Sequence, residues 1–260
     1  MKFSAHPVLK APTPEVIKAL CFNADDSTNE GGLEKLIEMH RMHEDAVANA
    51  TADPLNFGIT LRGWVYADAM FDLYDTCMCF GGNRSGKTEY GARSVVKAAI
   101  ENPNSIIICF AQDADASIRT QQEAIYRYLP PEFKVKTKSV TEYLNYTAKN
   151  GFTGQSFILP NGSQVFFHTY SQFIANRSKF EGLELGSKEA NWHNIGLWLD
   201  EYLEDGDLVA TMRFRLVTRD AKMLLTFTPI DGYTPFVAEF LKGAETTLER
   251  EAPLLDGEMV

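Results

Sequence analysis

Hydrophobic and polar positions change their period near residue 76 of this 260-residue chain. Before that point, apolar side chains recur at helical spacing over residues 33–40, on a segment that we expect to end near Ala50. Pro12 and Pro14 predict one turn ahead of this segment, and Gly31 and Gly32 predict another directly before it. We therefore predict that residues 1–55 form a helical N-terminal lead-in.

From Thr76 onward, short apolar runs alternate with helical stretches, which is typical of a mostly parallel sheet covered by helices. We expect helices from Gly86 to about Glu101 and from about Ala114 to Leu129. The segment FILPNGSQVFFHTY, with Asn161-Gly162 at its centre, predicts a β-hairpin. Buried strands are predicted at TCMCF (76–80), SIIICFAQ (105–112), NIGLWLD (194–200) and KMLLTFTP (222–229). The fold class is therefore α/β, with a mostly parallel central sheet, flanking helices and an antiparallel hairpin at its edge.

Composition narrows the classes of function. The net charge of −10 disfavours a stable, sequence-independent grip on nucleic acid, which needs a surplus of Lys and Arg. No apolar run has the length of a membrane span, and the N-terminus lacks a signal peptide, so we expect a cytosolic protein with no membrane contact. The four cysteines lack the spacing of a zinc site.

The chemistry begins with a phosphate-binding motif. The segment 81–88 matches G-x-x-x-x-G-K-[ST] in full, directly after a predicted strand and at the start of a predicted helix. Backbone N–H groups of such a loop converge on nucleotide phosphates, while its Lys reaches the β- and γ-phosphates and its Thr binds Mg²⁺. We therefore predict ATP and Mg²⁺ as cofactors, bound by Gly81, Gly82, Asn83, Arg84, Ser85, Gly86, Lys87 and Thr88.

A second motif, GLWLDEYL, ends a predicted strand in two acids. Mg²⁺ beside phosphates needs a carboxylate, and hydrolysis needs a group that orients water. We expect Asp200 to hold Mg²⁺, mostly through its waters, and Glu201 to act as general base. No guanine-reading N-K-x-D motif occurs, so the predicted reaction is ATP hydrolysis.

Two further elements belong to this predicted site. Arg84 lies inside the loop, where its guanidinium either reaches the γ-phosphate or faces solvent; the sequence leaves both open. Thr226 and Thr228 end the last apolar run at the carboxyl edge of the sheet, where ligands of such folds bind. Their hydroxyls are candidates for sensing the γ-phosphate.

These motifs together resemble the ATPase motor domain of the terminase large subunit of tailed bacteriophages, a P-loop NTPase of the ASCE/RecA-like class. The resemblance is carried by GGNRSGKT, WLDEYL and LLTFTP in this order, with FEGLEL (180–185) ahead of the acids. It covers roughly residues 60–240. We therefore expect a P-loop ATPase domain at 56–245 and a C-terminal tail at 246–260.

The resemblance implies Lys87 and Thr88 on phosphate and Mg²⁺, Asp200 on Mg²⁺, Glu201 as catalytic base, Arg84 as a cis-acting arginine and residues 226–228 as a coupling element. It also implies transient contact with double-stranded DNA, and the portal protein, procapsid and small terminase subunit as partners. The expected location is the portal vertex in the host cytoplasm. Family members work as rings, so we expect a monomer in isolation and a homo-oligomeric ring when assembled.

In such rings a neighbouring subunit donates an arginine in trans. Arg177 is the first candidate here, followed by Arg119 and Arg127, although each is equally compatible with a surface role. The family's adenine-reading glutamine is missing from residues 61–71, so Trp64 or Tyr66 is left to stack on the base or to serve as a core aromatic. Few residues follow Thr228, so we expect no nuclease activity from this chain.

Two basic groups are candidates for DNA contact. One consists of Lys134, Lys136 and Lys138, whose alternation is equally typical of a protected edge strand. The other lies at Arg213, Arg215, Arg219 and Lys222, near the last apolar run, where a solvated helix face is the alternative. Two alternatives to a DNA motor remain open from the sequence. One is a helicase-like or other P-loop ATPase on a different polymer, and the other is a nucleotide-gated assembly module.

Overall fold

The computed structural model describes residues 12–23, 27–134, 144–201, 206–228 and 237–244. Within these ranges a six-stranded sheet has the order β1-β8-β7-β2-β6-β5. Its strands are β1 (Thr76–Phe80), β2 (Ile106–Ala111), β5 (Ser156–Ile158), β6 (Gln164–Thr169), β7 (Ile195–Asp200) and β8 (Lys222–Phe227). All pairings are parallel except β5 with β6. The predicted mostly parallel sheet with an antiparallel edge hairpin is confirmed.

The helices also follow the predicted pattern. They are α1 (Pro14–Cys21), α2 (Glu30–Ala52), α3 (Pro54–Phe57), α4 (Arg62–Leu73), α5 (Lys87–Glu101), α6 (Ala114–Ala116), α7 (Glu123–Tyr128), α8 (Tyr170–Ala175) and α9 (Gly206–Val217). A π-helical segment, η2 (Ser117–Gln122), joins α6 to α7, so the single helix expected at 114–129 changes its hydrogen-bond period midway. Short 3-10 turns lie at η3 (Pro131–Phe133), η4 (Thr153–Gln155) and η5 (Arg177–Phe180), and β3 (Tyr146–Thr147) pairs with β4 (Gly151–Phe152).

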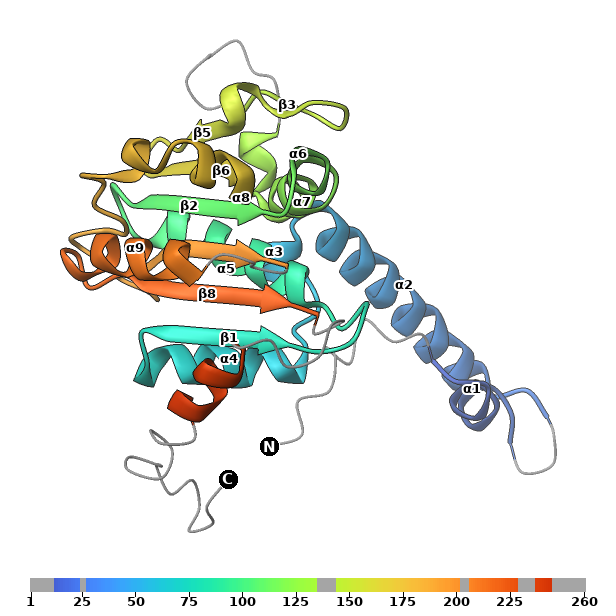
Figure 1. Ribbon diagram of the computed structural model, residues 1–260. Helices are drawn as coiled ribbons and strands as arrows, with labels where there is room; N and C mark the ends of the chain where they lie inside the picture. The colour runs from blue at the N-terminus through green and yellow to red at the C-terminus, as the bar shows by residue number, and fades with distance from the viewer. Residues whose placement is uncertain (1–11, 24–26, 135–143, 202–205, 229–236, 245–260) are drawn as a thin grey trace.

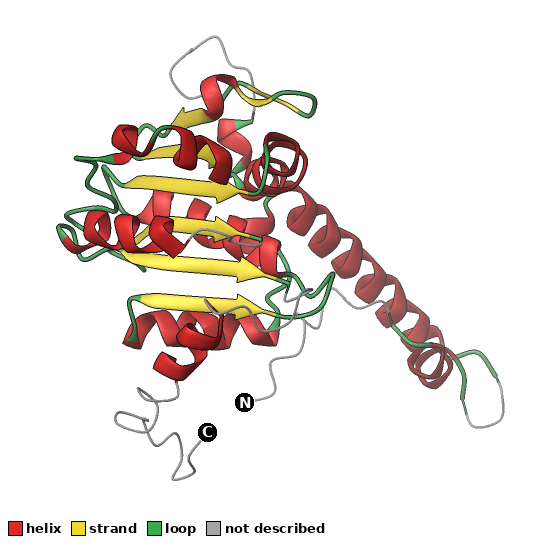
Figure 2. Cartoon of the chain, in the orientation of Figure 1, coloured by secondary structure: helices red, strands yellow, loops and turns green. Residues whose placement is uncertain are grey.

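Helices cover both faces of the sheet, as Figure 2 shows. On one face, α4, α5 and α7 pack through a core that includes Phe71, Val95 and Trp198. On the other face, α8, η5 and α9 pack through Phe173 and Met212, among others. Strand β7 is buried along its whole length because both of its faces are covered. The central strands are therefore a rigid platform for whatever lies at their ends.

The turn of the edge hairpin is fixed by Asn161 and Gly162. Gly162 has a φ of 83°, a left-handed conformation that glycine adopts without steric cost. The Asn161 side chain donates to the carbonyl oxygens of Ala99 and Ile100 at the end of α5. The predicted asparagine–glycine turn therefore also ties the hairpin to a helix of the core.

The N-terminal helices α1 and α2 form an arm that extends away from the sheet (Figure 1). Thr13 caps α1 through the Val16 N–H, and Asn29 caps α2 through the Gly32 N–H. The expected helical character of the lead-in is thus observed, while the domain boundaries at 55 and 245 stay predictions and the tail at 246–260 lies outside the described residues. No helix among the described residues is long and apolar enough to span a membrane.

Candidate active site

The loop between β1 and α5 is shaped for close backbone approach. Gly86 is the N-cap of α5, with a φ of 83° and no side-chain cap, so the N–H groups of the first turn lack intrahelical partners. Arg84 also takes a left-handed conformation, with a φ of 61°. A Cβ added to Gly82 would meet nothing within 4 Å. The loop therefore presents free backbone donors at the positive end of a helix, as an anion site requires.

Lys87 lies across this loop. Its Nζ donates to the carbonyl oxygens of Gly81 and Gly82 at 3.0 and 2.9 Å and to Ser85 Oγ at 3.3 Å. An ammonium group carries three donors and no acceptor, so these contacts use its full capacity. The ammonium is thus held over the loop, where negatively charged oxygens would compete with neutral ones for it.

The acid pair follows β7 at the same rim of the sheet. Strand β8 separates β7 from β1, and Thr226 on β8 donates to Asp200 Oδ1 at 2.6 Å. Thr88 Oγ1, at the start of α5, lies 3.4 Å from the same carboxylate oxygen. The structure therefore brings the loop and Asp200 together. The site inferred from the sequence requires this proximity.

Asp200 is only 3% exposed, and its electrostatics follow from that burial. The pKa of its carboxyl group is raised to about 7, chiefly by desolvation and also by the neighbouring Glu201 charge. The hydrogen bonds from Thr226 and Thr88, and the Lys87 charge, act in the opposite direction. A divalent cation at this carboxylate would favour its ionised form and remove the cost of burying the charge.

Glu201 has a strained backbone. Its φ of 64° is a left-handed conformation that few non-glycine residues adopt. Its N–H donates to the Thr226 carbonyl oxygen at 2.7 Å, which continues the pairing of β7 with β8 by one residue. Such strain persists where surrounding contacts impose it, and it is frequent at functional sites.

Two supporting residues were not identified from the sequence. Trp198 is fully buried, and its Nε1 donates to Thr226 Oγ1 at 2.7 Å. Tyr170 donates from its hydroxyl to the Asp200 carbonyl oxygen at 2.9 Å. Trp198 lies inside the apolar run that ends in Asp200, and its polar N–H is the one feature of the sequence that could have indicated a hydrogen-bonding role. Tyr170 follows a different strand, and nothing in the sequence connects it with Asp200. Both residues fix the end of β7.

Thr228 follows β8 and is partly buried. It has no side-chain hydrogen bond among the described residues, unlike Thr226, which is fully buried. The two threonines of the predicted coupling element therefore differ: Thr226 lies in the hydrogen-bonded centre of the site and Thr228 at its margin.

The two aromatic candidates for adenine contact lie on opposite sides of α4. Trp64 is 7% exposed, packs against Tyr90 and donates from Nε1 to the Gly86 carbonyl oxygen at 3.2 Å. Tyr66 is 54% exposed, and Arg62 donates to its hydroxyl at 2.9 Å. Trp64 is thus a core side chain that supports the loop, and base stacking by either residue stays a prediction.

The arginine candidates are engaged with carboxylates of the same chain. Arg177 pairs with Asp207 at 3.0 Å, Arg127 with Glu89 at 2.6 Å, and Arg119 with Asp115 at 2.8 Å. Arg84 is exposed on the loop. A role in trans for Arg177, Arg119 or Arg127 would require exchange of these intrachain pairs, and each such role stays a prediction.

The basic groups expected to contact DNA are dispersed. Lys134 donates to the Arg127 carbonyl oxygen, while Lys136 and Lys138 lie outside the described residues. Arg219 is bound to Glu184 and to the Gly186 carbonyl oxygen, and Lys222 to carbonyl oxygens at the end of α4. Arg213 is exposed on α9. A DNA-gripping role for these residues stays a prediction.

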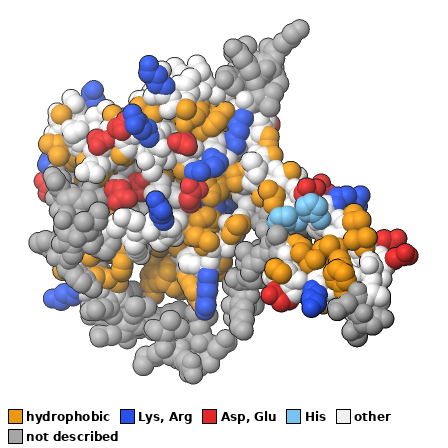
Figure 3. Space-filling model, turned by 90° about the vertical axis from the view of Figure 1, so that its right-hand side faces the viewer, with side chains coloured by type: hydrophobic (Ala, Val, Ile, Leu, Met, Phe, Trp, Pro, Cys, Tyr) orange, Lys and Arg blue, Asp and Glu red, His pale blue; other side chains and the backbone are white. Residues whose placement is uncertain are grey.

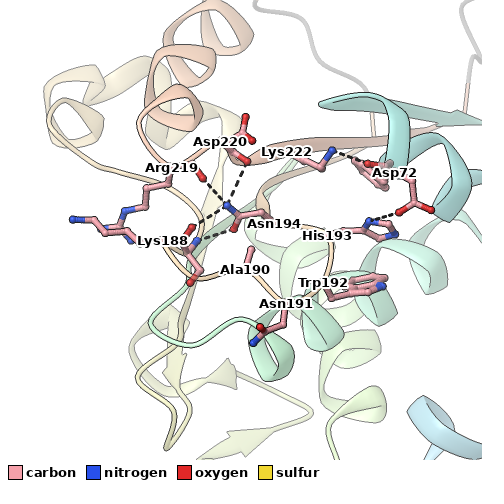
Figure 4. Close-up of a pocket in the computed structure, with 12 residues that line it drawn as sticks. Asp72, Lys188, Ala190, Asn191, Trp192, His193, Asn194, Arg219, Asp220 and Lys222 are labelled. Carbon is pink, nitrogen blue, oxygen red and sulfur yellow. Dashed lines mark hydrogen bonds and ion pairs between the residues drawn. The ribbon is translucent and has the colours of Figure 1, made fainter.

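A cavity of about 500 Å³ lies at the opposite, amino-terminal edge of the sheet. Figure 4 shows that polar side chains around it are already engaged: Asn194 donates to the backbone carbonyl oxygens of Ser187 and Arg219, and His193 lies 3.5 Å from an Asp72 oxygen. These contacts link the segments at the amino-terminal edge of the sheet. The site indicated by the sequence lies at the carboxyl-terminal edge.

The residues around Asp200 fit a Mg²⁺–nucleotide complex by the chemistry of their donors. A carboxylate and a threonine hydroxyl 3.4 Å apart are hard oxygen ligands of the kind Mg²⁺ prefers, and Mg²⁺ takes its remaining ligands from phosphates and water. The described residues contain no cluster of three or more His, Cys, Asp or Glu that could hold a metal ion alone.

Comparison with known proteins gives one match. The family model described as "Terminase large subunit, T4likevirus-type, N-terminal" matches residues 78–253. A search of curated proteins found no match. The family match covers well over half of the chain and includes the whole loop motif, the acid pair and the two threonines.

Proposed function

Because the chain belongs to the T4-like family of terminase large subunits, whose N-terminal part it matches, we propose that it is an ATP-hydrolysing motor. The family itself implies a role in packaging viral DNA. In our proposal, ATP hydrolysis by this domain drives double-stranded DNA into the procapsid. The fold supports this, since a strand carrying Thr226 lies between the loop strand and the acid strand of a mostly parallel sheet, as in a P-loop ATPase of the ASCE class.

The observation that carries the proposal is the convergence of three elements on one carboxylate oxygen. Thr88 comes from the start of α5, Asp200 from the end of β7 and Thr226 from the end of β8. The hydroxyl oxygens of Thr88 and Thr226 lie 3.4 and 2.6 Å, respectively, from Asp200 Oδ1. A phosphate-binding loop and a buried acid at this spacing are suited to sharing one Mg²⁺–triphosphate.

Each residue has a separate task in the proposed reaction. Thr88 and Asp200 would hold Mg²⁺, which would supply positive charge to offset the negative charge that develops on the phosphates. Lys87 moves its ammonium contacts from the loop carbonyls to phosphate oxygens. Glu201 orients the attacking water and accepts its proton. Arg84, exposed on the loop, adds positive charge toward the γ-phosphate.

Thr226 is the proposed link between the reaction and movement. Its hydroxyl contacts Asp200, and its carbonyl oxygen accepts the Glu201 N–H. Any shift of the acids after phosphate release therefore reaches β8 directly. We propose that the motor acts at the portal vertex in the host cytoplasm, as a homo-oligomeric ring with the portal protein, procapsid and small terminase subunit as partners.

The first experiment separates binding from turnover. Lys87→Ala should lose ATP binding and hydrolysis, whereas Glu201→Gln should retain nucleotide binding and lose at least about a hundredfold in turnover, because general-base loss costs about 10²–10⁴ in rate. Lys149→Ala and Glu189→Gln, both at exposed positions, are the matched controls. Binding is measured with a fluorescent ATP analogue and turnover by phosphate release.

Wild-type turnover in Glu201→Gln would refute the assignment of the base. Retained turnover in Lys87→Ala would refute the whole site. Stimulation of wild-type ATPase activity by duplex DNA, in the presence of portal and procapsid, then tests the motor. Equal stimulation by an unrelated polymer would contradict a packaging role, and the absence of any turnover in the assembled complex would favour a nucleotide-gated module.

A further inference from the structure

The arm formed by α1 and α2 carries exposed apolar side chains on one side of α2. Leu33, Ile37, His40, Glu44 and Val47 recur at spacings of four and three residues and share this side. Three of these positions are apolar, and the His40–Glu44 pair, 3.3 Å apart, lies between Ile37 and Val47. Leu33 is 44% exposed, Ile37 62% and Val47 42%. Figure 3 shows hydrophobic side chains gathered on this arm, beside acidic ones. A stripe with coiled-coil spacing is typical of a helix that packs against another helix.

The arm is acidic around this stripe. Helix α2 contains Glu30, Glu34, Glu38, Glu44 and Asp45, against only Lys35 and Arg41. The single Arg41 is paired with Glu38 on the same helix. A partner surface that complements the arm must therefore combine exposed apolar side chains with positive charge.

The same chain presents such a surface on α9. Val217 and Phe214 are 76% and 75% exposed, and together with Ile37 they are the most exposed large hydrophobic side chains among the described residues. Phe214 and Val217 lie three residues apart on the outer side of α9. Arg213 and Arg215 flank Phe214 in the sequence. Arg213 is exposed and its guanidinium lies 6.0 Å from the Phe240 ring centroid, whereas Arg215 is partly buried, so Arg213 supplies the positive charge beside Phe214. The C-terminal half of α9 is thus apolar and basic where α2 is apolar and acidic.

The arm does not reach α9 of its own chain, because Figure 1 shows α2 and α9 well apart on different sides of the sheet. Pairing two arms would bring acids together, and pairing two α9 helices would bring arginines together, which are both unfavourable. We propose that the α2 stripe of one subunit binds the C-terminal half of α9 on a second copy of this chain. Phe214 fills the space between Leu33 and Ile37, with Arg213 beside Glu34.

The contact joins two different surfaces, so each bound pair retains one free arm and one free α9. Such a heterologous contact continues from copy to copy and closes into a ring when the rotation allows. This inference rests on the proposed function, for which it supplies the ring contact. A single helix–helix contact is smaller than a stable standard-size interface, so we expect it to be weak until a scaffold gathers the subunits.

Cysteine cross-linking tests the contact directly. Ile37→Cys and Phe214→Cys are prepared as separate full-length proteins with tags of different size, mixed at high concentration without nucleotide, and treated with a short bismaleimide. The native Cys21, Cys77 and Cys109 are buried, and unmodified protein corrects for the half-buried Cys79. We expect a cross-linked heterodimer from the mixture and little dimer from either protein alone.

The matched control is Ile37→Cys mixed with Ile158→Cys, since Ile158 is 58% exposed on the edge hairpin. A yield with Phe214→Cys no greater than this control would overturn the proposal, as would equal cross-linking of Ile37→Cys with itself. Because no nucleotide is present, failure here leaves the ATPase assignment standing, and loss of the ATPase assignment leaves the cross-link unaffected.

A charge exchange gives a second readout. Glu34→Arg is added to the Ile37→Cys protein and Arg213→Glu to the Phe214→Cys protein. Either change alone should lower the yield of cross-linked heterodimer about two- to fivefold, the range for one exposed ion pair, and the two together should restore it. Thermal melting checks that both variants remain folded. Equal yields in all four combinations would refute the proposed register of Arg213 beside Glu34.

Discussion

Replacing Thr226 by valine should destabilise the protein and slow hydrolysis without creating a cavity. Valine has nearly the shape of threonine, so the change removes only the hydroxyl. The fully buried Trp198 Nε1 then loses its acceptor, and Asp200 loses its shortest hydrogen bond. Leaving a buried donor unsatisfied costs about 1–3 kcal/mol, and losing a hydrogen bond to a charged group costs a similar amount.

The two losses share one hydroxyl, so we expect a combined cost of about 2–4 kcal/mol in the free energy of unfolding. For a protein of this size, 1 kcal/mol corresponds to a shift in Tm of about 2–4 °C, which gives a decrease of about 5–15 °C. Circular dichroism melting at pH 8 measures it. Thr228→Val is the control, because Thr228 has no side-chain hydrogen bond among the described residues, and its cost should stay below about 0.5 kcal/mol.

Turnover provides the second readout for Thr226→Val. Because Thr226 positions the Asp200 carboxylate, kcat should fall more than ATP affinity. A double-mutant cycle with Trp198→Phe should show a coupling energy of about 1–2 kcal/mol between the two side chains. A Tm within about 2 °C of the wild type, or an equal decrease for Thr228→Val, would show that the hydroxyl is not the central support of the site.

Three further predictions concern stability. Gly91→Ala should lower the free energy of unfolding, measured with urea, by about 1–3 kcal/mol, because the added Cβ would clash with the Trp198 ring. Gly63 has open space around it, so Gly63→Ala should be neutral or stabilising, and equal effects of the two changes would refute the packing argument. Asn102→Ala should lower Tm by several degrees, since its buried amide binds the His193 carbonyl oxygen and two backbone N–H groups, and an unchanged Tm would contradict this. The pKa of Asp200 is about 7 in the fold against about 3.9 unfolded, so its burial penalty is absent below pH 4 and grows as pH rises to 7. In metal-free buffer, the stability advantage of Asp200→Asn over the wild type should therefore increase from pH 4 to pH 7, and a pH-independent difference would refute it.

Much of the fold follows from hydrophobic periodicity. The predicted strand 194–200 contains β7, and the predicted helix 86–101 contains α5, because their apolar patterns are long and the glycine loop marks a boundary. The order of the strands does not follow from such patterns, because it depends on which strands pair through long connections. That β8 lies between β1 and β7 is visible only in the structure.

The candidate site was predictable where a motif fixes both residue type and backbone shape, as at Gly86 and Lys87. It was not predictable where a common residue acquires its role through tertiary contact. Trp198, within β7, donates to Thr226 on the neighbouring strand β8, and Tyr170 reaches the end of β7 from a different chain segment. For Trp64 the sequence left a contact with the base and a place in the core both open, and the structure adds its burial and its hydrogen bond to the Gly86 carbonyl oxygen.

Strand β8 reaches both ends of the sheet. Thr226 lies near its carboxyl end beside Asp200, and Lys222 at its start donates to the carbonyl oxygens of Phe71 and Tyr74. The six residues span roughly 17 Å at the usual rise of a strand. An extended strand held on both sides by parallel neighbours resists compression along its axis. A displacement of Thr226 along the strand axis would therefore be transmitted through β8 to the end of α4, which packs against β1.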